Sequence, residues 1–92
     1  MVAFSAEEAH KRLAGLASWR IENEELVRRF EFKDFVEALG FVYRVGEAAE
    51  AAAHHPDIDI RYNKVRLALT THDAGGLTGL DFELAARIDD LI

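Results

Sequence analysis

The sequence predicts an α+β fold in which a four-stranded antiparallel sheet carries three helices on one face, in the order α-β-β-α-β-β-α. Two observations support this prediction. Ser5, Asp34 and Thr78 are each followed three residues later by an acidic residue, which is the pattern of a helix start. Between these starts, short segments alternate apolar and polar residues around local turns, as hairpins do. No β-α-β rhythm appears, so an antiparallel sheet is favoured.

The first half of the chain predicts a short helix and two strands. Ser5 caps the helix, which is expected to stop near Gly15. Residues 19–21 and 26–32 follow as strands around the polar turn 22–25.

The longest helix is predicted to begin after Asp34 and to end at or before His55, because a residue that precedes proline is pushed out of the helical region. Its apolar residues follow the spacing of one helical seam, and the small ones near its end would let another helix approach closely. The seam consists of Phe35, Leu39, Val42, Gly46, Ala49 and Ala53.

The second half predicts a hairpin and a closing helix. Ile58, Ile60 and Tyr62 alternate with charged residues, and a second alternating run begins at Val65. The simplest turn between them is the two-residue segment 63–64. The closing helix starts at Thr78, and its shared apolar face consists of Leu80, Leu84, Ile88 and Leu91.

Length, charge and composition limit the function classes. The chain of 92 residues, half of them hydrophobic, is expected to be one domain spanning residues 1–92. A domain this short buries only about two-thirds of its surface, so self-association is expected. The net charge of −6 argues against direct nucleic-acid binding, since Arg28 and Arg29 stand among glutamates.

The absence of cysteine excludes a disulfide framework and a thiolate metal site. No secretory signal and no apolar run of about 20 residues is present, so we expect a cytoplasmic protein without membrane attachment.

The predicted hairpin brings histidines together. With the turn at 63–64, Tyr62 faces Val65, and the same register sets His55 against His72. Directly opposed residues have Cβ atoms about 5 Å apart. His54 lies beside them where the long helix ends, so a three-histidine cluster is expected, conditional on this register.

Three interpretations of this cluster stay open on residue chemistry alone. Histidines at a helix end often serve only as a polar terminus. Three imidazoles can also hold zinc, although Glu50 is the one carboxylate at helical spacing. The third interpretation is acid–base chemistry, because one imidazole can donate a proton while another accepts one.

Two carboxylates could support the cluster. Glu50 lies four residues before His54 and could orient it, or could be an ordinary solvated helix residue. Asp81 occupies the third helical position after the Thr78 cap, where stabilising the helix start is its simplest role.

Taken together, these residues resemble the pterin-4a-carbinolamine dehydratases. The resemblance runs from about Trp19 to Leu91 and preserves the spacing between motifs. It rests on Glu50-Ala-Ala-Ala-His54-His55-Pro56, Tyr62, His72 and Asp81, with the stretches Phe30–Phe35, Gly40–Val42, Tyr62–Val65 and Thr70–His72.

The resemblance implies a dehydratase that converts 4a-hydroxytetrahydrobiopterin to quinonoid dihydrobiopterin and water, in tetrahydrobiopterin recycling. It implies dimers or tetramers built with the long helix, a pterin as substrate, and no cofactor or metal. His54 and His72 are the expected catalytic acid–base pair. His55, Glu50 and Asp81 are the expected substrate-binding residues.

The sequence departs from the family pattern at two places, and the family also offers an alternative function. Residues 57–61 lack an aromatic residue that some relatives carry after the proline, and residues 51–53 are all alanine, which could alter the grip on the pterin. Some members of the family also act as dimerisation partners of transcription factors. A non-enzymatic interaction module is therefore the alternative function.

Overall fold

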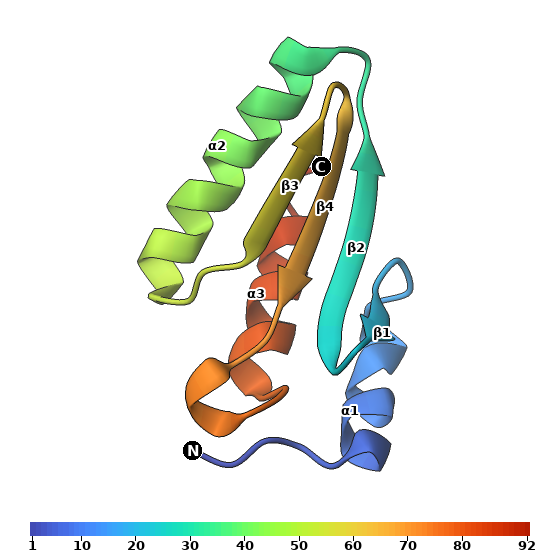
Figure 1. The fold of residues 1–92 in the computed structure, drawn as a ribbon, viewed down its shortest axis with the longest axis vertical. Coiled ribbons are helices and arrows are strands. Elements are labelled where there is room, and N and C mark those ends of the chain that lie inside the picture. Colours follow the sequence, from blue (N-terminus) through green and yellow to red (C-terminus); the bar gives the residue numbers. More distant parts are fainter.

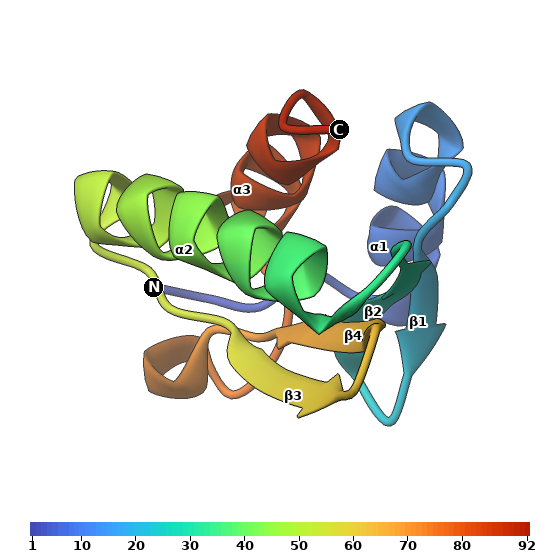
Figure 2. The same ribbon diagram turned by 90° about the horizontal axis from the view of Figure 1, so that it is seen from above.

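The computed structural model describes residues 1–92 and has two layers, a sheet and a layer of helices that all lie on one of its faces (Figure 1 and Figure 2). The sheet is antiparallel throughout, with the strand order β1-β2-β4-β3. The predicted fold class and element order are confirmed. The elements are α1 (Ala6–Arg12), η1 (Leu13–Gly15), β1 (Arg20–Glu22), β2 (Glu25–Glu31), α2 (Phe35–Ala52), β3 (Asp57–Arg61), β4 (Lys64–Leu69), η2 (His72–Ala74) and α3 (Gly79–Asp89).

All three α-helices begin at the predicted caps. The Ser5 hydroxyl accepts the Glu8 amide at 3.1 Å, and the Asp34 carboxylate accepts the Glu37 amide at 2.9 Å. Thr78 forms a complete capping box with Asp81. Each cap satisfies amide groups that the first helical turn leaves without partners, which fixes where each helix enters the core.

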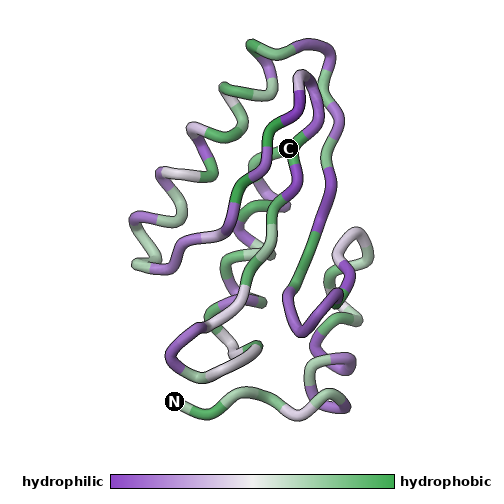
Figure 3. The backbone as a smooth tube through the Cα atoms, in the orientation of Figure 1, coloured by the Kyte–Doolittle hydropathy of each residue, from purple (hydrophilic) through white to green (hydrophobic).

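The core lies between the sheet and the helices. Along β3 and the first four residues of β4 the hydropathy alternates residue by residue, so that one face is apolar and the other charged (Figure 3). Phe41 of α2 is fully buried, with its ring centroid 4.7 Å from that of Phe30 and 4.9 Å from that of Phe32. The sheet side of this core consists of Leu26, Phe30, Val65, Leu67 and Leu69.

The predicted seam of α2 is wrong over its N-terminal half. Phe35 and Leu39 remain 44% and 42% exposed, whereas Ala38, Phe41 and Val45 are fully buried. Both stripes are apolar and have the same period, so the pattern alone does not determine which one faces the sheet. The aromatic cluster around Phe41 determines it, and the other stripe remains on the surface.

The predicted turn of the second hairpin is also wrong. The turn is Tyr62–Asn63, with Tyr62 at a φ of 56°, and the register pairs Ile60 with Val65. Asn63 is held from the neighbouring strand, because its carbonyl accepts the Phe32 amide at 2.9 Å and its side-chain amide donates to the Phe32 carbonyl at 2.7 Å. These two bonds place Asn63 inside the turn and move every pairing by two residues.

The first hairpin differs from its prediction by one residue at each of its four strand boundaries. Its turn is Asn23–Glu24, and both residues have positive φ values of 51° and 63°, as tight hairpin turns that match the twist of the strands require. No helix of the structure has the length and apolar character needed to cross a membrane.

Candidate active site

The site begins where α2 ends. Ala53 adopts the left-handed conformation, with φ 52° and ψ 38°. The His54 amide donates to the Ala49 carbonyl, and the Ala53 amide donates to the Glu50 carbonyl, both at 3.1 Å. This is the Schellman pattern, which closes a helix and turns the chain away from its axis. His54 and His55 therefore leave the helix at its end instead of continuing one of its faces.

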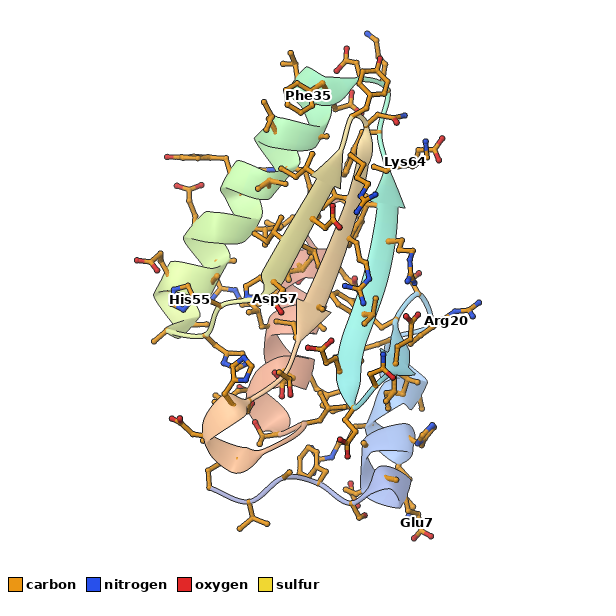
Figure 4. All side chains as sticks on the ribbon, viewed as in Figure 1. Glu7, Arg20, Phe35, His55, Asp57 and Lys64 are labelled. Carbon is orange, nitrogen blue, oxygen red and sulfur yellow. The ribbon has the colours of Figure 1, made fainter.

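All three predicted histidines line one open cleft of about 300 Å³ at this end of the molecule. The register correction means that His55 and His72 are not a cross-strand pair, since β3 starts at Asp57 and β4 ends at Leu69. The end of α2 and the loop after β4 bring them together instead. Figure 4 shows His55 at this end of α2. The cleft is lined by Met1, Ala53, His54, His55, Thr70, Thr71, His72, Asp73 and Leu80.

A buried carboxylate holds His54. The His54 Nε2 atom lies 2.6 Å from Asp81 Oδ1, and the Asp81 side chain is 0% exposed. The second oxygen, Oδ2, accepts the Thr71 hydroxyl at 2.8 Å and the Thr78 amide at 2.9 Å. Asp81 therefore combines its predicted capping role with a direct bond to a cleft histidine. It lies behind His54 and does not line the cleft.

Glu50 contacts His55, not His54. Its carboxylate pairs with the His55 Nε2 atom, and the two side chains are 78% and 61% exposed. The predicted partnership of Glu50 with His54 is wrong because it assumed that the helix continues through residue 54. The left-handed turn at Ala53 directs His54 toward α3 and leaves His55 at the rim with Glu50.

His72 enters the cleft from the opposite wall. It opens η2, a single turn that is closed by the bridge between Thr71 and Gly76. Its imidazole is exposed and has no side-chain hydrogen bond within the chain. The cleft thus contains one histidine paired to a buried carboxylate, one paired at the rim, and one without a carboxylate partner.

Thr71 and Thr78 also belong to the site, although neither is among the site residues predicted from the sequence. Both are buried, at 5% exposure, and their hydroxyl oxygens lie 2.9 Å apart. A signal was present, since Thr71 continues the inward alternation of Val65, Leu67 and Leu69. A polar side chain at the next inward position needs a buried partner.

A larger hollow of about 540 Å³ lies on the helix-free face of the sheet, near Lys64 and away from His55 (Figure 4). It has no histidine, and Arg29 and Arg61 there already pair with Glu22 and Asp59. No group of three or more histidine, aspartate or glutamate side chains is arranged to hold a metal ion. The histidine cleft is therefore the better candidate for proton-transfer chemistry.

Fold and site together define a small α+β protein with a cleft at one end of its sheet that is lined by three histidines. The family model described as pterin 4 alpha carbinolamine dehydratase matches residues 2–91. The chain belongs to this family.

Two bacterial relatives agree with this assignment. A protein of Acidobacterium capsulatum is 54% identical over the full length of both chains, and one of Chloroflexus aurantiacus is 56% identical over all of this chain and 99% of its own. Both are named pterin-4-alpha-carbinolamine dehydratase, as a provisional assignment.

Two solved structures share the fold. The transcriptional coactivator/pterin dehydratase of Brucella melitensis superposes with a TM-score of 0.91 at 33% identity, over 97% of each chain. A pterin dehydratase-like protein described as a RuBisCO assembly factor in the alpha-carboxysome superposes with a TM-score of 0.68 at 26% identity, over 80% of this chain and 88% of its own.

Proposed function

We propose that this protein dehydrates a pterin-4a-carbinolamine by histidine acid–base catalysis. The observation that carries the proposal is the convergence of His54, His55 and His72 on one cleft, with His54 bonded to the buried Asp81. Family membership over residues 2–91 supports the same substrate class. The physiological role that follows is the recycling of tetrahydrobiopterin.

The reaction needs two proton transfers. A carbinolamine carries a hydroxyl group on the carbon next to an N–H group. When the N–H proton is removed, its electron pair forms the new C=N bond, the C–O bond breaks, and the oxygen leaves as water once it has received a proton. A base on one side and an acid on the other each contribute on the order of 10²- to 10⁴-fold to such a step.

The two catalytic histidines have different surroundings, which suggests their roles. His54 is bonded to Asp81, whose negative charge stabilises the imidazolium that forms when His54 accepts a proton. We therefore assign His54 as the base. His72 has no carboxylate bonded to its ring and is assigned as the acid that protonates the leaving oxygen. His55, at the rim with Glu50, is assigned to binding and orienting the pterin.

The direct test is the decay of a synthetic 4a-carbinolamine, followed by its absorbance with and without the purified protein. We expect acceleration at catalytic amounts of protein, and no acceleration by boiled protein. No acceleration at micromolar protein would contradict a dehydratase and would favour the alternative, an interaction module.

A second proposal concerns self-association. The stripe of α2 that does not face the sheet exposes large apolar side chains, with Val36 at 76% and Tyr43 at 69% exposure beside Phe35 and Leu39. Apolar patches of this kind on a small domain are typical of protein contacts. We propose that α2 joins copies of the chain into dimers or tetramers. The same surface would serve a heterologous partner in the alternative function.

A further inference from the structure

Thr71 lies at the centre of a hydrogen-bond chain that ends on His54. Its hydroxyl oxygen is 2.8 Å from Asp81 Oδ2 and 2.9 Å from the Thr78 hydroxyl oxygen. The Thr78 oxygen also accepts the Leu80 amide, at 3.3 Å. Thr71, Thr78 and Asp81 are buried, His54 is only 11% exposed, and no buried polar side-chain atom of the protein lacks a partner.

The donor and the acceptor of each hydrogen bond in this network can be assigned from the chemical groups present. The Thr71 hydroxyl and the Thr78 amide both donate to Oδ2. An ionised carboxylate can only accept, so the bond at Oδ1 assigns the third donated proton to His54 Nε2. The single proton of the Thr71 hydroxyl is committed to Oδ2, and the Thr78 hydroxyl must therefore donate to Thr71. On the other oxygen, Oδ1 accepts the proton on His54 Nε2. A neutral His54 then has its lone pair on Nδ1, the nitrogen that remains free to accept a proton.

We infer that Thr71 is a positioning residue for this site, which holds Asp81 in the orientation that keeps the His54 proton on Nε2. The inference rests on the proposed dehydratase function and goes beyond the residues assigned to it. A carboxylate attached only through the backbone of its helix could rotate about its terminal bond. The Thr71 hydroxyl, from the segment that follows β4, adds a second bond to Oδ2 beside that of the Thr78 amide, so that Oδ1 points at His54.

The same contact joins the two walls of the cleft. Thr71 directly precedes His72, and Asp81 belongs to α3 behind His54. One hydroxyl group therefore links the segment that carries the proposed acid to the carboxylate that holds the proposed base. The methyl group of the Thr71 side chain cannot form this hydrogen bond. The hydroxyl and the methyl group can therefore be tested separately.

The test compares Thr71→Val, which removes the hydroxyl at nearly constant volume, with Thr71→Ser, which retains it. We expect Thr71→Val to lower kcat at least tenfold with KM changed less than threefold, and Thr71→Ser to stay within threefold of the parent in both. Ile88→Val, a change in the buried face of α3, serves as a destabilised control with full activity. A folded Thr71→Val protein with normal kcat, or an equal loss in both Thr71 variants, would overturn the inference.

A spectroscopic arm separates this inference from the proposed function. In ¹⁵N-labelled protein, neutral His54 should show a protonated Nε2 and an unprotonated Nδ1 in the parent and in Thr71→Ser. In Thr71→Val the Nε2 proton should exchange faster with water or be shared between both nitrogens. This readout requires no turnover, so a parent protein without activity would contradict the dehydratase proposal alone. Identical His54 spectra in all three proteins would overturn the positioning role.

Discussion

At the residue scale, the cleft depends on an unfavourable backbone conformation at Ala53. A φ of 52° brings the Cβ of an L-residue close to the backbone, and the cost is of the order of 1 kcal/mol. Glycine is the usual residue at this helix position because it lacks that atom. The alanine is nevertheless held there by the two amide bonds that close α2 and by the bond between His54 and Asp81.

Ala53→Gly is therefore expected to stabilise the protein by about 0.5–1 kcal/mol, as measured by urea denaturation. The matched control is Ala51→Gly, at an exposed position within α2, which should destabilise it by about 0.5–1 kcal/mol. Destabilisation by both variants to the same extent would show that Ala53 is not held in the left-handed region.

A second residue-scale prediction concerns pH. The hydrogen bonds from the Arg29 guanidinium, at 2.8 and 3.1 Å, lower the pKa of Glu22 below its ordinary value of 4.5. A carboxyl group with a lowered folded-state pKa adds stability above its unfolded pKa, and this is lost as the pH falls through the folded value. The stability difference between the parent and Glu22→Gln should thus be present at neutral pH and vanish in acid.

The measurement is the free energy of unfolding of both proteins across the acid range. Glu24→Gln, at a neighbouring exposed carboxylate without a side-chain hydrogen bond, is the control and should show no such loss. A Glu22→Gln difference that is constant with pH would contradict the pairing with Arg29.

At the scale of elements, the β3–β4 hairpin shows that an alternating pattern predicts the face on which a residue lies but not the residue with which it pairs. A register error of two residues preserves the alternation, so Ile58 and Ile60 still share the face of Leu67 and Val65, as predicted, although Ile58 on the edge strand is 40% exposed. The residues that pair across the hairpin differ from those predicted, so the predicted cross-strand contact of His55 with His72 does not form. Local turn chemistry could not reveal this, because Asn63 is fixed by Phe32, which is 31 residues away.

For the site as well, the sequence predicted which histidines come together but not which residues they contact. The three histidines were identified from spacing and resemblance, although the geometric argument for their meeting was wrong. The partners of His54 and His55 were not predictable, because they depend on where the helix is broken at Ala53 and on how α2 and α3 pack. Both are tertiary features that a linear pattern does not contain.

Asn63→Ala tests the corrected turn. Loss of the amide that donates to the Phe32 carbonyl should destabilise the protein by about 1–2 kcal/mol in chemical denaturation. Lys64→Ala, at the exposed first residue of β4, should change the stability by less than about 0.5 kcal/mol. If the turn were instead Asn63–Lys64, the larger effect would not be confined to Asn63.

At the scale of the whole molecule, charge and apolar surface are separated. The helix-free face of the sheet carries rows of charged residues near Lys64, whereas the outer stripe of α2 around Phe35 is apolar (Figure 4). The histidine cleft lies at the other end of α2 from Phe35. Association through the N-terminal part of α2 would therefore leave the cleft open to a substrate.

Self-association can be tested at this scale. Leu39→Glu is expected to shift the protein to a monomer in sedimentation velocity, while Ala86→Glu, which adds the same charge on the exposed face of α3, should not. A parent protein that stays monomeric at about 100 µM would contradict the proposed role of α2.

The central claim is that His54 and His72 exchange protons with one bound pterin. The most direct measurement is the rate of carbinolamine dehydration by His54→Ala, His72→Ala and the double variant, each checked for its fold by circular dichroism. We predict that each single change lowers turnover at least tenfold, of the order that a lost acid or base group costs. A folded double variant that dehydrates the substrate at close to the parent rate would contradict the claim.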